Sequence, residues 1–376
     1  MSCTSLKLAF QNTKRKQKII RTNVSYYLDD KRLNPLIEHT RARLGKAFKA
    51  FPLPCGGCLH CRLKHSRNWA IRCIHEASQN KDNMFITLTY KPEALPVNNT
   101  FNFDHPVEFM KNLRRHICEE SGCRRAIYTR LFRGEYRLKH PVTVYGCVGA
   151  CPKIKSYGCA EYGEKGGRPH YHLLIFGYNF TDRYKWKMSK NPRMKCMRYR
   201  SDSLEKIWKH GYSEMGTVTM QSAGYVARYV VKKNKSDEQI RNILGRFHEQ
   251  SICVSRREGI GLTWLKKFHM DIYATDTLTY KTRQGDLAKM KPPSYYDRKV
   301  EQLGLVDFVK IKIVRAENFA KSILTTKKQS LDKEFLRKQK TRDLLRCYPT
   351  EDETCCKYML FLTKRTMPLE TFSCLL

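Results

Sequence analysis

Apolar and polar positions alternate along the first half of the chain in patterns that predict both helices and strands. Apolar residues recur at helical spacing over about 66–79, where Ser66 is the expected N-cap, and again over 107–117. Residues 84–90, MFITLTY, are rich in strand-forming side chains and end at a Lys-Pro turn, so they predict a strand. Helices and strands are therefore mixed in this region.

The following region adds a hairpin and a further helix. Residues 155–177, KSYGCAEYGEKGGRPHYHLLIFG, predict two antiparallel strands, because strand-forming runs flank the glycine-rich turn 163–167. A short strand is expected over 214–220, followed by a helix over 222–233 that is capped near Ser222. This order of elements predicts an α+β fold whose sheet is largely antiparallel.

Composition divides the chain into four expected segments. Residues 1–50 are polar and basic with little apolar periodicity, and they are interpreted as an arm. Residues 51–240 form the expected main domain with a cysteine-rich start, in which 119–153 has no clean period and is interpreted as an insertion. Residues 241–300 continue this region, and 301–376 are expected to be a basic tail, helical or disordered.

Charge points to the kind of partner. The chain carries 72 Lys and Arg residues against 35 Asp and Glu, a net charge of +37, which favours a polyanion and above all nucleic acid. No apolar run approaches the length of about 18 residues that a spanning helix needs, and the N-terminus lacks the hydrophobic segment of a signal peptide. The 16 cysteines are scattered, which predicts reduced thiols in a cytoplasm.

Two histidines interrupt the apolar run GRPHYHLLIFG. His170 and His172 are two residues apart, so on a strand their side chains share one face. Glu161 is the expected neighbour across the hairpin, at about 5 Å between Cβ atoms, and Glu164 in the turn is the rival third ligand. Two imidazoles and a carboxylate predict a divalent metal site with open positions. The bland alternative is a half-buried strand whose histidines face water.

A helix-borne phenol is the candidate nucleophile. Tyr225 and Tyr229 are four residues apart, so a helix places both phenols on one face. Arg228, Lys232 and Lys233 surround them with positive charge that favours a phenolate and DNA phosphates. The alternative is that the tyrosines fill a core, but the neighbouring valines supply a separate apolar stripe for that purpose.

Three motifs in this order carry a family resemblance: FITLTY, RPHYHLLIF and YVARYVVKK. Together they resemble the motifs of HUH-type rolling-circle replication initiators with two tyrosines, and most of all those of gokushovirus-like microviruses, which are small single-stranded DNA phages. PCGGCLHCRLKHSRNWAIRCIHEA, CAEYGEKGGRPHYHLLIFG and SRREGIG are also similar to that group. The likeness spans roughly residues 50–300.

The resemblance implies the HUH endonuclease fold, a central antiparallel sheet that is flanked by helices and carries the histidine pair on its middle strand. It implies nicking of one strand of origin DNA, in which tyrosine becomes linked to the 5′ phosphate and a free 3′ hydroxyl primes synthesis, with Mg²⁺ or Mn²⁺ as cofactor. The two tyrosines would share the cutting and rejoining steps. The implied partners are viral origin DNA and the host replication helicase and polymerase, in the cytoplasm of the host bacterium.

Cysteines at three-residue spacing form a separate motif, PCGGCLHCR. Cys55, Cys58 and Cys61 have the spacing of zinc ligands. Candidates for a fourth ligand are Cys73, His60 and His65. A thiol cluster without an ion is the equally weighted alternative, since no second C-x-x-C pair follows, and an iron–sulfur cluster is a weaker one.

Basic residues that alternate with aromatic ones over 183–200 predict contacts to single-stranded or unwound DNA. The candidate DNA-binding residues are Arg168, Arg228, Lys185, Trp186, Lys187, Arg193 and Lys195. A solvated basic loop whose aromatics pack on the core is the alternative.

Three function classes remain open. The first is a DNA-nicking initiator, and the second is a DNA-binding regulator with zinc and no chemistry. The third is a nucleotide hydrolase of the histidine-triad type, which needs a third histidine where this chain has Leu174.

Overall fold

The structure is a computed structural model that describes residues 6–12, 20–26, 33–44, 48–56, 58–121, 125–129, 143–147, 151–163, 167–188, 196–229, 251–281 and 287–321, together with residues 332 and 335. The chain divides into two compact units. The sheet unit comprises Ala70–Met188 and Cys196–Lys267, and the terminal unit comprises Met1–Trp69, Ser189–Lys195 and Phe268–Leu376.

A seven-stranded sheet organises the sheet unit. Its order is β12 (Ser251–Ile252), β7 (Lys155–Tyr162), β8 (Pro169–Phe176), β4 (Asn83–Tyr90), β11 (Gly211–Gly216), β10 (Met197–Arg200) and β9 (Tyr184–Met188). Every neighbouring pair in this sheet is antiparallel. The predictions of an α+β fold, of a strand at 84–90 and of a hairpin over 155–177 are confirmed. The middle strand is β4, and the histidines lie on β8 beside it.

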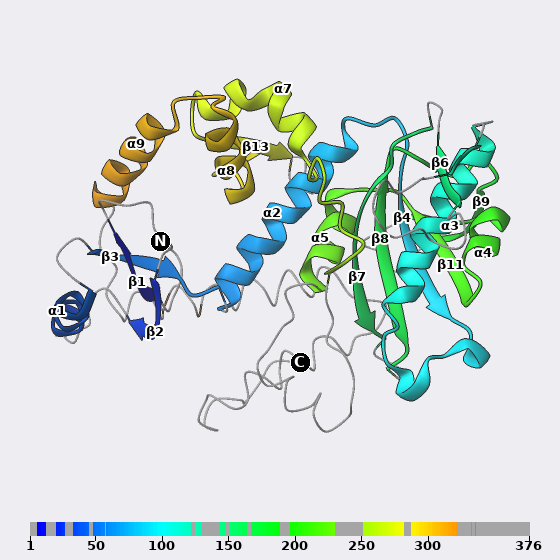
Figure 1. Ribbon diagram of the computed structural model, residues 1–376, viewed down its shortest axis with the longest axis horizontal. Helices are drawn as coiled ribbons and strands as arrows, with labels where there is room; N and C mark the ends of the chain where they lie inside the picture. The colour runs from blue at the N-terminus through cyan, green and yellow to red at the C-terminus, as the bar shows by residue number, and fades with distance from the viewer. Residues whose placement is uncertain are drawn as a thin grey trace, which may run out of the picture. The chain divides into compact units, whose positions relative to one another are not determined.

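One face of this sheet, here called the core face, is apolar. Ile86 and Leu88 of β4 alternate with polar residues and are fully buried against α3 (Asp104–Glu120) and α4 (Asp202–Ile207). Figure 1 shows both helices on the side of the sheet away from α5. The amphipathic pattern at 107–117 therefore identified α3, whose buried residues recur at helical spacing.

The opposite face, here called the site face, is covered at β7 and β8 by α5 (Met220–Tyr229) (Figure 1). This helix begins two residues earlier than predicted. Thr219 and Ser222 cap it reciprocally: the Ser222 N–H donates to Thr219 Oγ1 at 3.2 Å, and the Thr219 N–H donates to Ser222 Oγ at 2.8 Å. Ala223, Val226 and Ala227 are fully buried, so α5 rests on the sheet through small apolar side chains.

Helix α2 (Leu59–Ala77) is longer than its pattern predicted. It begins at Leu59, so Ser66 is a buried residue inside the helix rather than its N-cap. Near its end, His75 stacks on Trp264 with ring centroids 3.5 Å apart. Burial lowers the pKa of His75 to about 3, so this imidazole is neutral in the folded chain.

The terminal unit contains regular structure where a basic arm was expected. Within residues 1–50 lie β1 (Leu6–Asn12), β2 (Ile20–Tyr26) and α1 (Leu33–Leu44). With β3 (Phe48–Pro54) the strands form an antiparallel sheet in the order β2-β1-β3. Polar residues between the apolar ones of β1 hid this strand, because its pairing with β3 stabilises it more than its own composition does.

The later part of the terminal unit is tied together by one arginine. This part contains the hairpin β13 (Leu278–Lys281) and β14 (Leu287–Met290), then α8 (Ser294–Leu303) and α9 (Phe308–Lys321). Arg315 Nη1 donates to Asp297 Oδ2 at 2.8 Å, and Arg315 Nε donates to Asp276 Oδ2 at 2.8 Å. The Asp297 carboxylate also accepts from the Tyr273 hydroxyl at 2.8 Å.

The remaining elements connect these parts. They are the short 3₁₀ turns η1 (Pro92–Ala94) and η2 (Val97–Asn99), the hairpin β5 (Arg125–Thr129) and β6 (Thr143–Cys147), and α7 (Leu262–Tyr273). The hairpin lies inside 119–153, so the described part of this segment is regular. Most of the tail from 322 onward lies outside the described residues.

Candidate functional site

The hairpin register places the predicted metal ligands together. Glu161 on β7 is the direct partner of His170 on β8, as predicted, and His172 is two residues along the same face. One Glu161 oxygen, Oε2, lies 3.2 Å from His172 Nε2, and both of these side chains are buried. The other candidate, Glu164, lies outside the described residues.

Two threonines orient the imidazoles, and the sequence analysis did not identify them. Thr87 Oγ1 lies 3.1 Å from His172 Nδ1, and Thr89 Oγ1 lies 2.9 Å from His170 Nδ1. A hydroxyl that accepts from the Nδ1–H group fixes the tautomer whose Nε2 carries a lone pair. Thr87 and Thr89 pair with His172 and His170 across β4 and β8. The alternation in FITLTY, which sends both threonines to one face, was the available signal.

The donor set fits a divalent cation. Glu161 Oε2 is buried and lacks a hydrogen-bond donor among the described residues, although its side chain is only 7% exposed. A buried carboxylate oxygen of this kind is costly unless a cation satisfies it. The ring centroids of His170 and His172 are 6.5 Å apart, and the three ligand atoms are not gathered within 4.8 Å of one another. Two imidazoles and one carboxylate nevertheless match the preferences of Mn²⁺ and related ions.

Burial keeps His170 in its neutral form. Desolvation, with a smaller contribution from nearby His172, lowers the pKa of His170 to about 4, although Glu161 acts in the opposite direction. A neutral imidazole is the form that binds metal. At physiological pH the His170 ring therefore needs to lose no proton before it can act as a ligand.

Tyr225 on α5 reaches these groups. Its hydroxyl lies 3.3 Å from Glu161 Oε1 and 3.5 Å from His172 Nε2. The phenol ring meets the His172 ring edge to face, with centroids 5.0 Å apart, and Phe85 contacts both rings. A helix-borne phenol thus lies beside the histidine pair, which is the arrangement that a tyrosine nucleophile requires.

Gly163, just after β7, leaves the space that the His170 ring occupies. A Cβ atom at this position would lie 2.5 Å from His170 Nε2. The chain turns back here, since the Gly163 N–H donates to the Arg168 carbonyl oxygen at 2.8 Å. Arg168 itself points its guanidinium to the Tyr90 carbonyl oxygen, with Nη1 at 3.2 Å.

Other predicted site residues are placed only in part. The backbone of Tyr229 ends α5, one turn after Tyr225, and Arg228 is half-buried in the same last turn. Lys232, Lys233, Arg193 and Lys195 lie outside the described residues, as does the side chain of Tyr229.

A basic and aromatic row continues the site face toward the far edge of the sheet. Lys187 on β9 and Arg198 on β10 both contact Glu214, at 2.7 and 2.8 Å, and Glu214 pairs with Thr87 across β11 and β4. The guanidinium of Arg200 lies 4.6 Å from the centroid of the Trp186 ring, which is 48% exposed. Every residue of β9, including Lys185, is exposed.

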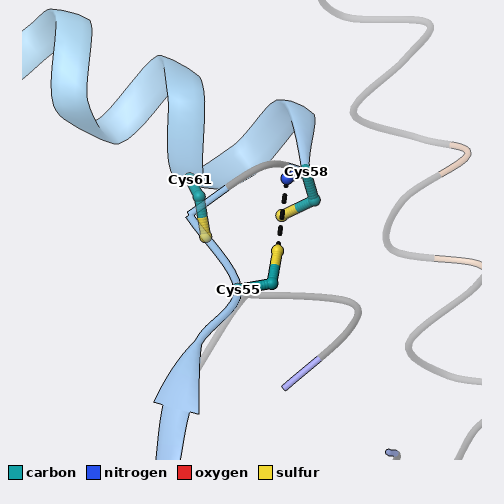
Figure 2. Close-up of side chains that lie close together, drawn as sticks. All are labelled: Cys55, Cys58 and Cys61. Carbon is teal, nitrogen blue, oxygen red and sulfur yellow. Dashed lines mark hydrogen bonds between the residues drawn. The ribbon is translucent and has the colours of Figure 1, made fainter. Parts of the chain in front are cut away.

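Figure 2 shows the three cysteines of the second predicted site converging where β3 ends and α2 begins. The sulfur atoms of Cys55, Cys58 and Cys61 all lie within 4.8 Å of one another. Cys73 does not join them. It follows Cys61 by twelve residues on the same helix, which corresponds to about 18 Å along the axis, and it is fully buried. Burial raises the pKa of its thiol.

Comparison with known proteins identifies the class. Residues 83–234, which include β4, β7, β8 and α5, match the model of a family described as Replication-associated protein ORF2. This segment is therefore related to phage replication-associated proteins, as the motifs predicted. No solved structure gives a significant match.

Individual relatives are similar over a longer stretch. The chain is 31% identical to Replication-associated protein VP4 of Bdellovibrio phage phiMH2K over 242 residues, which cover 63% of this chain and 65% of the relative, just under two thirds of its length. It is 29% identical to Replication-associated protein ORF2 of Spiroplasma virus 4 over 256 residues, 66% of this chain and 68% of that protein. Replication-associated protein ORF4 of Chlamydia phage 1 is 32% identical over 185 residues, 49% of this chain and 39% of that protein.

Hydropathy adds one finding about the helices. None of those in the described ranges combines the length and the apolar character that crossing a membrane requires.

Proposed function

We propose that this chain is a replication initiator that nicks one strand of phage origin DNA through Tyr225. The observation that carries the proposal is the position of the Tyr225 hydroxyl, 3.3 Å from Glu161 and 3.5 Å from His172. The similarity to phage replication-associated proteins supports the replication role. The chain would act in the cytoplasm of the host bacterium, with the host replication helicase and polymerase as partners.

In the proposed reaction the Tyr225 oxygen attacks the phosphorus of a DNA phosphodiester. The new bond joins Oη to phosphorus, the bond from phosphorus to the 3′ oxygen breaks, and its electron pair leaves on that oxygen. Glu161 Oε1, which accepts the hydrogen bond of the phenol, takes the phenolic proton, and the 3′ oxygen gains a proton from solvent. The 5′ phosphate stays on tyrosine, so the phosphodiester energy is kept for rejoining.

The two oxygens of Glu161 support a division of labour. Oε1 faces Tyr225, whereas Oε2 faces His172. Mg²⁺ or Mn²⁺ held by His170, His172 and Glu161 would polarise the scissile phosphate as a Lewis acid. Thr87 and Thr89 would keep both Nε2 atoms available, and Phe85 would hold the His172 and Tyr225 rings in place.

Tyr229, Lys232 and Lys233 have proposed roles from sequence alone. Tyr229 is the proposed second nucleophile, because it follows Tyr225 by one helical turn. The lysines would hold DNA phosphates, as would Arg168, Arg228, Arg193 and Lys195. A single strand would run over Lys185, Trp186 and Lys187, where exposed cationic and aromatic side chains lie together.

The test is the formation of a covalent protein–DNA adduct. Overlapping labelled single-stranded oligonucleotides from the genome that encodes this chain are incubated with the protein and Mn²⁺. We expect one of them to yield an adduct that survives denaturation and does not form in EDTA. Tyr225→Phe should lower its yield strongly, and Tyr225→Phe combined with Tyr229→Phe should abolish it, whereas Tyr280→Phe on β13 should change nothing.

Each other outcome favours a different function. An adduct that persists in the double variant would refute the tyrosine mechanism. Binding without any adduct would favour a DNA-binding regulator, and release of free nucleotides would favour a hydrolase. The hydrolase is disfavoured because Leu174, on the face of the two histidines, is fully buried and offers no third imidazole.

A further inference from the structure

The cysteine cluster, Cys55, Cys58 and Cys61, has no part in the proposed cleavage. Cys55 directly follows β3, and Cys58 directly precedes α2. Gly56 between them has a φ of +76°, a left-handed conformation that glycine adopts at little cost and that reverses the chain. Cys61 lies in the first turn of α2 and is 9% exposed. The fold therefore builds a compact sulfur site from seven consecutive residues.

The local geometry suits thiolates more than thiols. The Cys58 N–H donates to Cys55 Sγ at 3.2 Å, and a hydrogen bond of this kind is stronger when the sulfur is ionised (Figure 2). The first turn of α2 adds the positive end of a helix dipole, which also lowers thiol pKa values. Three thiolates this close repel one another, so they require a cation between them.

The spacing of the sulfurs fits one ion. A single Zn²⁺ binds thiolate at about 2.3 Å, so sulfurs around it lie no more than about 4.6 Å apart. All three sulfur atoms lie within 4.8 Å of one another, which requires little adjustment. Thiolates select zinc, copper(I) or iron–sulfur clusters, and zinc has the tetrahedral preference that this arrangement of three sulfurs begins to fill.

His65 is the side chain best placed to complete a tetrahedron. It follows Cys61 by four residues on α2, so the two side chains share one face of the helix. The His65 side chain is exposed and meets the edge of Trp69, with ring centroids 6.5 Å apart, so a change of rotamer can turn it toward the sulfurs. His60 is next to Cys61 in sequence and therefore points about 100° away around the helix.

We propose that Cys55, Cys58, Cys61 and His65 bind one structural Zn²⁺ that joins the end of β3 to the start of α2. Because the folded site would be held by the ion, removing it should loosen this junction. The proposal is independent of the nicking activity and of its Mg²⁺ or Mn²⁺ site.

The test measures metal content in the full chain purified under reducing conditions. We expect about one zinc per chain, lost in Cys58→Ser and kept in Cys196→Ser, whose thiol is exposed and outside the cluster. His170→Ala should also keep its zinc, which separates this site from the proposed catalytic one. Protein without zinc that binds none on titration, or protein with iron and acid-labile sulfide, would overturn the proposal. So would a disulfide among the three cysteines, detected by alkylation and mass spectrometry.

Cobalt substitution tests the ligand set in the wild-type fold. Co²⁺ should give the visible bands of a tetrahedral site and a sulfur-to-metal charge-transfer band whose intensity corresponds to three thiolates. Cys55→Ser should reduce that band by about one third, while His65→Ala should leave it intact, shift the visible bands and weaken zinc binding at least about 100-fold. Unchanged bands and affinity in His65→Ala would refute His65 as the fourth ligand. If Cys58→Ser does not fold, the charge-transfer intensity of the wild-type protein still decides the sulfur count.

Discussion

Gly163→Ala tests whether the exact position of the His170 ring controls the proposed cleavage. The added Cβ would lie 2.5 Å from His170 Nε2, whereas ordinary contact begins near 3.4 Å. The ring must therefore move by about 1 Å, the difference between these two distances. A misplacement of about 1 Å in a reacting group can cost on the order of 100-fold in rate. We expect a loss of this size in cleavage, with DNA affinity nearly unchanged because affinity comes from dispersed charge.

The assay is single-turnover cleavage of the reactive oligonucleotide, with Mn²⁺ binding measured in parallel. Gly216→Ala is the matched control, because its new Cβ would lie 3.6 Å from a carbon of Phe85, an ordinary contact. Both variants should melt within a few degrees of the wild type. If Gly163→Ala cleaves within about threefold of the wild-type rate while Mn²⁺ affinity is unchanged, then the His170 ring is not a ligand on which cleavage depends.

Three further changes test other parts of the structure. Trp186→Ala should weaken binding of single-stranded DNA by about 1–3 kcal/mol through lost base stacking, measured by fluorescence anisotropy, and an unchanged affinity would remove β9 from the proposed DNA path. Arg315→Met should destabilise the terminal unit by about 2 kcal/mol, because it leaves two partly buried carboxylates without their partner; urea unfolding that matches the wild type would contradict this. The pKa of His75 is about 3 in the folded chain against 6.5 for the free side chain, so the unfolded chain binds the extra proton between these values. Stability should fall with decreasing pH below 6.5 by up to about 1.4 kcal/mol per unit from this group, and His75→Gln should flatten the slope of unfolding free energy between pH 6.5 and pH 5.

Periodicity identified the elements that carry the site. Alternation predicted β4 and the hairpin of β7 and β8, and the glycine-rich turn predicted the pairing of Glu161 with His170. Helical spacing predicted that Tyr225 lies on a helix. These predictions succeeded because each depends on contacts that are close in sequence or joined by a short turn.

Long-range pairing was beyond the reach of local pattern. The insertion of β4 between β8 and β11 brings Thr87 and Thr89 to the imidazoles, but β4 and β8 are separated by more than 75 residues in sequence. The strands at the N-terminus were missed for the same reason, since β1 gains its stability from β3 about 40 residues later. The start of α2 was placed too late because its first turn is polar and cysteine-rich.

Strand β8 is read on both sides at once. Tyr171, Leu173 and Ile175 belong to the apolar core, while the residues between them include the two histidines. A deletion or insertion of one residue within this strand would exchange the two sets, burying imidazoles in the core and presenting leucine to the site. Length changes in phages of this kind should therefore gather in the connecting segments, while β8 evolves by substitution alone.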